Sequence, residues 1–400
     1  MAGMNETPKG ERLHIAFFGK RNAGKSSLVN AFTGQSLSIV SDVKGTTTDP
    51  VYKAMELLPL GPVMIIDTPG IDDEGELGKL RIEKALQVLH KTDFAIIVAD
   101  CTQPLGTEEQ TLIKSANEKN VPYLIAYSKS DLPHAPVEEQ ENIVLTSSKN
   151  GEGIYELKER VAKMARVNAS SRRIVSDLLQ TGDVAVLVVP IDKAAPKGRL
   201  ILPQQQTIRD IIDAGATAMV CRDSELETTL QKLSGPPRMV ITDSQVFGSV
   251  GKIVPDGIPL TSFSILMARY KGDLPLVTAG ASTVSTLKDG DKILIAEGCT
   301  HHRQCEDIGT VKIPGLIRKK LGIEPKFHFV SGTEFPADLS EYRLVIHCGG
   351  CTLTEREMQY RLELCQNAGV PVTNYGILLA HLNGILKRSV ELFPSVASLL

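Results

Sequence analysis

The chain has 400 residues, 42% of them hydrophobic, and this length predicts two or three domains rather than a single core. Its 44 Lys and Arg residues are balanced by 47 Asp and Glu residues, so no global basic field indicates nucleic-acid binding. It shows no signal-peptide pattern and no apolar run near the roughly 18 residues of a membrane helix, which predicts a soluble, cytoplasmic protein. Its seven cysteines are then more typical of metal or redox sites than of disulfides.

The first motif is a phosphate-binding loop. Residues 14–19 (HIAFFG) are typical of a buried strand, residues 19–26 match G-x-x-x-x-G-K-[ST], and a helical pattern follows. We expect backbone N–H groups of the loop to face phosphates, Lys25 to reach the outer phosphates and Ser26 to bind Mg²⁺. A glycine turn that binds nothing is disfavoured by the strand–loop–helix context. The residues expected to contact the nucleotide here are Gly19, Asn22, Ala23, Gly24, Lys25, Ser26 and Ser27.

Two further segments complete the predicted phosphate and Mg²⁺ site. Residues 63–70 (VMIIDTPG) predict a strand that brings Asp67 toward the metal and Gly70 toward the γ-phosphate. Residues 45–49 (GTTTD) match a switch loop, in which Thr47 is the candidate Mg²⁺ ligand. The predicted catalytic residues are Lys25, Thr47, Asp67 and Gly70.

The next segments indicate that the base is guanine. Residues 94–100 (FAIIVAD) and 123–131 (YLIAYSKSD) are apolar strands in the rhythm of a parallel α/β sheet. Asp131 can accept hydrogen bonds from the N1–H and exocyclic amine of guanine, although Ser128 stands where GTPases carry asparagine. The residues expected around the base are Lys129, Asp131, Ser147 and Ser148. These motifs together resemble the GTPases of the Era and TrmE type, over about 150 residues.

Two positions bear on the hydrolysis mechanism. Ile71 follows the DTPG motif where Ras-like proteins place a glutamine that orients water, so we expect slow intrinsic hydrolysis. Asn22 matches an asparagine that resembles a K⁺ ligand in TrmE-type enzymes. The alternative for Asn22 is an asparagine that simply tolerates a tight loop.

The middle segment predicts a small α/β unit without a catalytic constellation. Apolar strands are expected in residues 183–192, 217–222 and 238–243, and residues 195–215 suggest a loop, a short strand and an amphipathic helix. Such a unit is small for independent stability, and an exposed sheet edge could pair with a second copy. We therefore expect a homodimerisation domain, with Cys221 a buried apolar residue.

Cysteines follow two predicted strands of the last segment. Residues 292–298 (KILIAEG) end directly before Cys299, and residues 342–347 (YRLVIH) end directly before Cys348, with Cys351 three positions later. Because ligand residues gather past the carboxyl ends of strands in a parallel sheet, these three cysteines are expected to converge. Cys101 and Cys365 have no ligand-like neighbours and are interpreted as packing residues.

Residues alone leave the identity of the metal open. With a histidine as fourth ligand the three thiolates could bind a structural zinc, and with one open position they suit an iron–sulfur cluster. Chance burial of cysteines is the remaining alternative. A helix over residues 354–369, with Thr354 and Glu357 as a capping box, would direct its N-terminus at the site and favour thiolates. The candidates for a fourth ligand or supporting group are His301, His347, Cys305 and Glu306.

The GTPase motifs, residues 195–206 (APKGRLILPQQQ), residues 299–314 (CTHHRQCEDIGTVKIP) and residues 347–351 (HCGGC) together resemble the HydF family of [FeFe]-hydrogenase maturation GTPases. The resemblance covers nearly the whole chain. It implies an α/β protein with a P-loop GTPase domain (1–170), a small dimerisation domain (175–262) and a [4Fe–4S] cluster-binding domain (263–400). It also implies that Cys299, Cys348 and Cys351 are the cluster ligands.

The same resemblance implies the role and the partners. The protein would be a scaffold or carrier that receives a [2Fe] subcluster precursor from the maturases HydE and HydG and passes it to the apo-hydrogenase HydA. Two alternatives are an RNA-modification or ribosome-assembly GTPase with a structural zinc module, and a redox enzyme that uses Cys348 and Cys351 as a dithiol. A basic, aromatic-bearing surface is missing for the first, and the second leaves Cys299 and His301 without a role.

Overall fold

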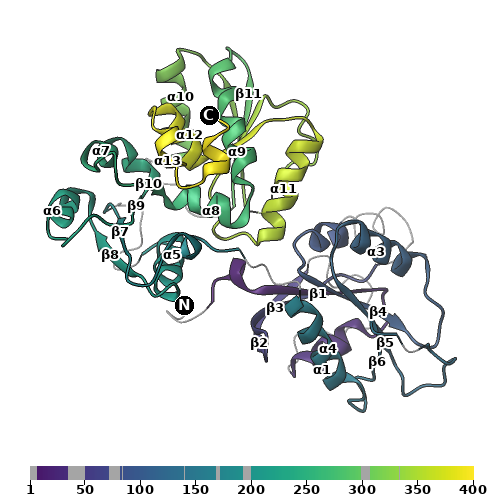
Figure 1. Ribbon diagram of the computed structural model, residues 1–400. Helices are drawn as coiled ribbons and strands as arrows, with labels where there is room; N and C mark the ends of the chain where they lie inside the picture. The colour runs from purple at the N-terminus through teal and green to yellow at the C-terminus, as the bar shows by residue number, and fades with distance from the viewer. Residues whose placement is uncertain are drawn as a thin grey trace. The chain divides into compact units, whose positions relative to one another are not determined.

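The computed structural model describes residues 7–34, 50–71, 82, 84–138, 140–167, 172–191, 200–298, 307–332 and 334–400 (Figure 1). The chain forms two compact units, Met1–Ser171 and Arg172–Leu400. Among the helices in these ranges, none is long and apolar enough to cross a membrane.

The first unit is built on a six-stranded sheet. Its strands are β1 (Leu13–Gly19), β2 (Val51–Leu57), β3 (Gly61–Asp67), β4 (Phe94–Asp100), β5 (Tyr123–Ser128) and β6 (Ile143–Leu145), in the order β2-β3-β1-β4-β5-β6. Its helices are α1 (Lys25–Thr33), α3 (Thr107–Glu118) and α4 (Ile154–Val167), and residues 84–89 are also helical. All neighbouring strands are parallel except β2 with β3. The predicted parallel α/β fold is confirmed, and the antiparallel edge strand β2 is an addition to it.

Strand β1 lies inside the sheet and is buried on both faces. Ile15 and Phe17 pack with α1 and α4, whereas Ala16 and Phe18 pack with α3 and the helical residues 84–89. Figure 1 shows α1 and α4 on the opposite side of the sheet from α3. Burial on both faces explains why β1 is apolar almost without interruption. Because β1 and β3 are parallel neighbours, their carboxyl ends place Gly19 and Asp67 at the same edge.

The second unit begins with a four-stranded parallel sheet. Its strands are β7 (Val184–Val188), β8 (Thr217–Cys221), β9 (Met239–Thr242) and β10 (Leu260–Ser262), in the order β10-β9-β7-β8. Its helices are α5 (Leu202–Asp213), α6 (Leu226–Gln231), α7 (Phe247–Ile253) and α8 (Phe263–Lys271). The short strand expected before α5 does not form in its described part: Leu200 and Ile201 lead directly into the helix, whose first turn contains Pro203.

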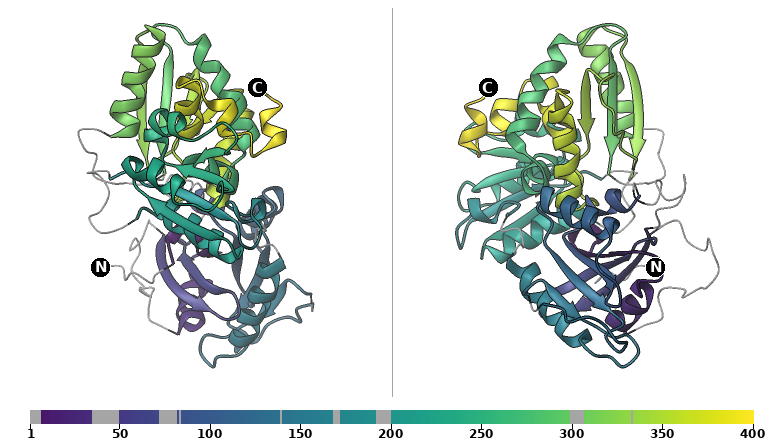
Figure 2. Two further views of the ribbon diagram at one scale, coloured as in Figure 1. Left: turned by 60° about the vertical axis from the view of Figure 1, so that its left-hand side comes forward. Right: turned by 90° about the vertical axis from the view of Figure 1, so that its right-hand side faces the viewer.

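A second parallel sheet follows in the same unit. Its strands are β11 (Lys292–Glu297), β12 (Lys326–Ser331), β13 (Leu344–His347) and β14 (Val372–Asn374), in the order β12-β11-β13-β14. Its helices are α9 (Leu274–Ala281), α10 (Ile313–Leu321), α11 (Glu355–Asn367), α12 (Tyr375–Leu382), α13 (Leu386–Ser389) and α14 (Pro394–Ala397), and a π-helical turn (Ile308–Lys312) precedes α10. Short 3₁₀ turns lie at Lys9–Glu11, Ser176–Leu178, Asp223–Glu225, Ser244–Val246 and Ser282–Thr286. Figure 2 shows these strands running side by side in one direction.

Both faces of the second sheet are covered. Ile293 and Ile295 of β11 pack with α10 and α12, and Leu294 and Ala296 pack in the cluster that includes α11. Figure 1 shows α10 and α11 on opposite sides of β11. The second cluster also contains the inner residues of β7 and β9, so the two sheets of this unit share one hydrophobic core. Helix α8 contacts α5, α11 and α12 and links the two sheets.

Candidate functional site

The phosphate loop brings together three of the predicted residues. The ammonium of Lys25 is paired with the carboxylate of Asp67, and these side chains are only 7% and 9% exposed. The hydroxyl of Ser26 donates to Asp67 Oδ2 at 3.2 Å. Ser27 lies beside them in the first turn of α1. Lys25, Ser26 and Asp67 therefore form one compact charged cluster at the N-terminus of α1, where the helix dipole favours an anion.

The loop backbone depends on glycine at two points. A Cβ at Gly19 would lie 2.5 Å from the Val98 carbonyl oxygen, and Gly24 has a φ of +81°, with Ser128 Oγ 3.1 Å from the position of a Cβ. Asn22 also has a positive φ, +61°, and its side chain is exposed. Asparagine tolerates this conformation better than most residues, so the backbone conformation alone can explain why an asparagine stands at position 22, without a ligand role. Its assignment to K⁺ stays a prediction.

The segment after β3 is tied to β1. The amide and hydroxyl of Thr68 donate to the Phe17 carbonyl at 3.2 and 2.7 Å, and the Ile71 amide donates to the Gly19 carbonyl at 3.2 Å. A Cβ at Gly70 would lie 3.1 Å from the Arg21 backbone. Gly70 is thus held directly against the phosphate loop, as a γ-phosphate contact requires. Thr47 lies outside the described residues.

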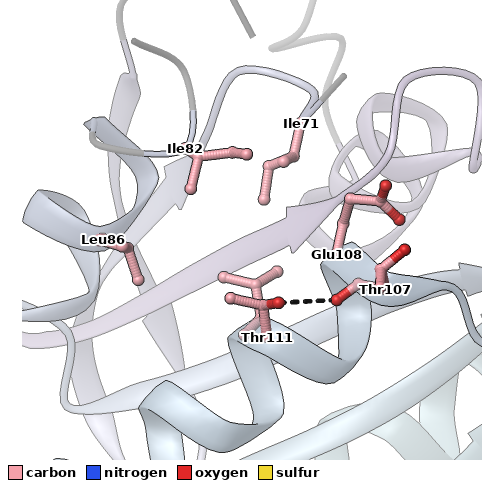
Figure 3. Close-up of a pocket in the computed structure, with 7 residues that line it drawn as sticks. Ile71, Ile82, Leu86, Thr107, Glu108 and Thr111 are labelled. Carbon is pink, nitrogen blue, oxygen red and sulfur yellow. Dashed lines mark hydrogen bonds between the residues drawn. The ribbon is translucent and has the colours of Figure 1, made fainter. Parts of the chain in front are cut away.

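The side chain of Ile71 is buried and has no group that could orient a water molecule. It is 3% exposed and lines a cavity of about 70 Å³. Figure 3 shows it facing Ile82 and Leu86 across this cavity. The other lining residues come from α3: Thr107, Glu108, Thr111 and Leu112. The site therefore lacks a hydrogen-bonding side chain at this position, in keeping with the slow hydrolysis expected from the sequence.

Lys20, which sequence reasoning missed, joins the phosphate loop to α3. Its ammonium lies 2.6 Å from Glu108 Oε2 and 3.4 Å from Glu109 Oε2. The hydrogen bond with Glu108 raises the pKa of Lys20. Both carboxylates have side chains only 5% exposed, so the pairing is partly desolvated and fixes the start of the loop.

Ser128 holds the phosphate loop from the side of the base-binding segment. It is 2% exposed, and its hydroxyl lies 2.5 Å from the Ala23 carbonyl and 3.1 Å from the Ala99 carbonyl. A hydroxyl has one proton, so it donates to one of these oxygens at a time, whereas an asparagine amide has two donors. Serine can therefore tether the loop and has no donor left for the base.

The remaining base-binding candidates follow the neighbouring parallel strands β5 and β6. Ser147 donates to Asp131 Oδ1 at 2.7 Å, and this bond lowers the pKa of Asp131, so the carboxylate stays an acceptor near neutral pH. Lys129, with a φ of +63°, places its ammonium 2.6 Å from Asp100 Oδ2. Ser148 is partly buried beside Ser147.

We predict that Ser128→Ala will release GDP faster, by about tenfold, because the Ala23 carbonyl loses its buried donor. Ser128→Thr keeps a hydroxyl and should release GDP at the native rate. The measurement is stopped-flow release of fluorescently labelled GDP, with Ser130→Ala as a control, since the hydroxyl of Ser130 donates to the exposed residue Glu152 and its backbone bond to Thr146 is kept in the variant. Equal rates for the Ala variant and the native protein would contradict the tether.

The loop that contains Cys348 and Cys351, called the cysteine loop below, follows β13. Strands β11 and β13 are parallel neighbours, with Ala296 paired to His347, so both strand ends lie at one edge. Cys348 Sγ accepts the amide of Gly298 at 3.0 Å and that of Gly350 at 3.4 Å. Thr352 Oγ1 donates to the Gly298 carbonyl at 2.9 Å. Both the amide and the carbonyl of Gly298, the residue that precedes Cys299, are therefore bonded to this loop.

These contacts fit a metal-bound thiolate. Amide donors directed at sulfur stabilise a thiolate ligand and tune an iron–sulfur cluster. Without metal, desolvation raises the pKa of the Cys348 thiol to about 11 despite the two amides, which lower it. The expected preference for thiolate therefore requires the metal itself. Within the described ranges no group of three metal-ligating side chains occurs. Cys299, His301, Cys305 and Glu306 lie outside these ranges.

His347 is built into the protein behind this loop. It is 1% exposed; its Nδ1 lies 2.9 Å from the Cys348 carbonyl, and its Nε2 lies 3.0 Å from Nη1 of Arg361. Because a guanidinium only donates, Nε2 is the acceptor and Nδ1 carries the proton. Burial, and then Arg361, lowers the pKa of His347 to about 3. Both ring nitrogens have protein partners, which favours a supporting role over that of a ligand.

The helix after the cysteine loop begins as expected, but its predicted capping box is only half formed. Thr354 Oγ1 accepts the Glu357 amide at 3.1 Å. The Glu357 carboxylate instead accepts from Nε and Nη2 of Arg361 at 3.1 and 2.8 Å. The buried Arg361 cation attracts the carboxylate more strongly than a neutral amide does. Neither Arg361 nor its contact with His347 was predicted.

The other described cysteines are buried outside the loop. Desolvation raises the pKa of Cys101, Cys221 and Cys365, the last to about 12. Such thiols are protonated and inert, in agreement with packing roles.

Sequence models of three protein families match the chain. The 50S ribosome-binding GTPase family matches residues 14–129, the Hydrogen maturase F dimerization domain matches residues 174–272, and the Hydrogen maturase F tetramerization domain matches residues 275–392. The first match covers the phosphate loop and the DTPG segment, and the third covers the cysteine loop. The domain names support self-association of the chain.

Individual relatives match the chain only in part. GTPase Der of Wolinella succinogenes is 32% identical over 42% of this chain and 38% of its own length, and the tRNA modification GTPase MnmE of Helicobacter pylori (strain HPAG1) is 40% identical over 31% and 26%. The chain thus spans well under half the length of these relatives.

Solved structures resemble the chain weakly. Aquifex aeolicus Era has a TM-score of 0.33 at 18% identity over 52% of this chain and 92% of that one, and the T. maritima FeoB G domain has 0.30 at 24% over 39% and 99%. The fold assignment therefore rests on the sheet order described above and on the family models. Since the two Hydrogen maturase F models together match more than half of the chain and a GTPase model precedes them, the chain belongs to the Hydrogen maturase F (HydF) family.

Proposed function

We propose that the chain is a GTPase and an iron–sulfur scaffold that receives a [2Fe] subcluster precursor and delivers it to apo-[FeFe]-hydrogenase. Its partners are then the maturases HydE and HydG as donors and HydA as acceptor. The observation that carries the proposal is the pair of bonds between the two strand ends, from Gly298 to Cys348 and from Thr352 to Gly298. They join the segment before Cys299 to the loop that holds Cys348 and Cys351.

Cys299, Cys348 and Cys351 are the residues that would hold a resident [4Fe–4S] cluster. Cys299 directly follows Gly298, and Gly298 is bonded to the loop that contains the other two cysteines. Such a cluster supplies an iron position to which a further metal fragment can attach. The chain itself provides amide donors to sulfur, a buried wall formed by His347 and Arg361, and a neighbouring carboxylate, Glu297, which accepts from Tyr375 at 3.2 Å. His301, Cys305 and Glu306 remain candidates for the fourth position.

Metal analysis tests the cluster half of the proposal. Protein purified without oxygen is expected to be brown and to contain iron and sulfide, and the Cys348→Ala variant is expected to lose both. Zinc without iron would favour the RNA-modification GTPase with a zinc module. That rival is already less well supported, because the similarity to the MnmE relative named above and to a further MnmE of Helicobacter pylori (strain J99) reaches at most 43% of the chain, whereas the two HydF models match most of the rest.

In the nucleotide half, Lys25, Ser26, Thr47, Asp67 and Gly70 are proposed to bind Mg²⁺ and the phosphates of GTP. Asp131 selects guanine. Hydrolysis is slow because the side chain of Ile71 is buried and cannot orient water.

We predict that K⁺ in place of Na⁺ will raise GTP turnover, by about tenfold or more, because Asn22 would hold a cation that offsets charge at the β- and γ-phosphates. Asn22→Ala should remove this difference between the salts. Asn120→Ala is a matched control, because Asn120 also has a positive φ, +50°, but follows α3. The same rate in both salts would leave Asn22 without a role in cation binding.

Self-association is proposed to be a homodimer through β8. This strand is at the edge of its sheet, and Val220 is 45% exposed. We predict that Val220→Lys weakens the dimer at least about tenfold, because a charged side chain on an edge strand opposes pairing. Sedimentation of the variant beside Leu132→Lys, an exposed position in the first unit, tests this. An unchanged dimer would place the interface elsewhere.

A further inference from the structure

A buried lysine donates hydrogen bonds to the backbone of the cysteine loop. Lys271, the last residue of α8, is 2% exposed. Its ammonium donates to the carbonyl of Cys351 at 3.0 Å and to that of Leu353 at 2.8 Å. Burying an ammonium is costly unless it is bonded, and here carbonyl oxygens on both sides of Thr352 bond it. One side chain therefore fixes the backbone immediately after Cys351.

The position of Lys271 is itself fixed by neighbouring elements. Nε2 of Gln359 in α11 donates to the carbonyls of Lys271 and Gly272 at 3.1 and 3.0 Å. Arg172 donates to the Gly272 carbonyl at 2.9 Å and lies 3.1 Å from the Glu355 carboxylate at the start of α11. With its backbone held in this way, the lysine has little freedom to follow the loop if the loop moves.

We infer that Lys271 is a positioning residue for Cys351 and supplies positive charge to the metal site. The inference rests on the proposed cluster function. A thiolate-bound cluster is an anionic group in a partly buried site, and its reduction potential rises with nearby positive charge and hydrogen bonds. Lys271 lies in the segment matched by the dimerization-domain model, and the cysteine loop lies in the segment matched by the tetramerization-domain model. A residue of the first segment would therefore stabilise the cysteine loop of the second.

The first test compares variants of the full chain reconstituted with iron and sulfide. Lys271→Met removes donor and charge, Lys271→Gln keeps a donor, Lys271→Arg keeps the charge, and Lys319→Met removes an exposed lysine on α10 as the control. We expect the Met variant to lose iron to a chelator about tenfold faster than the native protein. The Gln variant should have a lower reduction potential than the Arg variant.

Iron retention and potential in the Met variant equal to those of the native protein would overturn the inference. If the Met variant does not fold, the Arg and Gln variants decide, and equal potentials for these two would overturn the charge role.

The second test needs no metal. Hydrogen–deuterium exchange of the amides of residues 348–354 should be about tenfold faster in the Met variant than in the Lys319 control, because two loop carbonyls lose their donor. Unchanged exchange would overturn the anchoring role. A native protein that binds no iron would instead contradict the proposed function, and this exchange measurement would still decide whether Lys271 holds the loop.

Discussion

Replacing Lys25 is expected to lower GTP turnover by about a thousandfold, because the phosphates lose the cation that offsets their developing charge. The structure adds a second effect. Lys25 is paired with Asp67 in a cluster with little solvent exposure, so Lys25→Met alone removes the paired cation from a buried carboxylate. Breaking such a pair costs about 3–5 kcal/mol of the free energy of unfolding.

A double variant separates catalysis from stability. Lys25→Met with Asp67→Asn removes both charges and should recover most of the melting temperature, while turnover stays lost. Lys114→Met, a surface lysine of α3, is the control for both measurements. Turnover in the double variant near the native level would show that this cluster is not the phosphate site.

The second large effect is expected at the cysteines. Replacing Cys299, Cys348 and Cys351 together with alanine should abolish iron–sulfur binding, since no thiolate of the proposed set remains. GTP hydrolysis should stay at the native rate, because these residues lie in a different folded unit from the phosphate loop. Iron and sulfide analysis and a phosphate-release assay on the same preparation check both halves. Replacing the buried Cys101, Cys221 and Cys365 should leave the iron content unchanged.

The parts predicted from sequence are those that local rules determine. The phosphate loop and Asp67 could be placed because each follows a strand directly, and neighbouring parallel strands end at one edge. The same rule brought the end of β11 to Cys348 across some fifty residues. Ser128 was recognised only as a departure from a motif; its bond to Ala23 became visible in the structure.

The groups that sequence reasoning missed share one property. Lys20, Lys271 and Arg361 are long cations, and each has at least one partner that is far away in the chain or on a different element. Sequence spacing says nothing about such contacts, because tertiary packing decides which carbonyl or carboxylate a flexible side chain reaches. His347 illustrates the consequence: its neighbours in sequence suggested a ligand, and Arg361, fourteen residues later, occupies its free nitrogen.

We predict that the proposed cargo delivery and GTP turnover are separable functions of one chain. A Lys25 variant should still contain the iron–sulfur cluster and be impaired in loading or in release from its partner. The three-cysteine variant should have the opposite defect.

Hydrogen evolution by apo-HydA tests the central claim most directly. The protein is produced together with HydE and HydG, purified without oxygen and mixed with apo-HydA. The native chain is predicted to activate the hydrogenase, and the chain lacking Cys299, Cys348 and Cys351 is predicted to give no hydrogen above background while hydrolysing GTP normally. Full activation by that variant would contradict the carrier function proposed for the cysteine site.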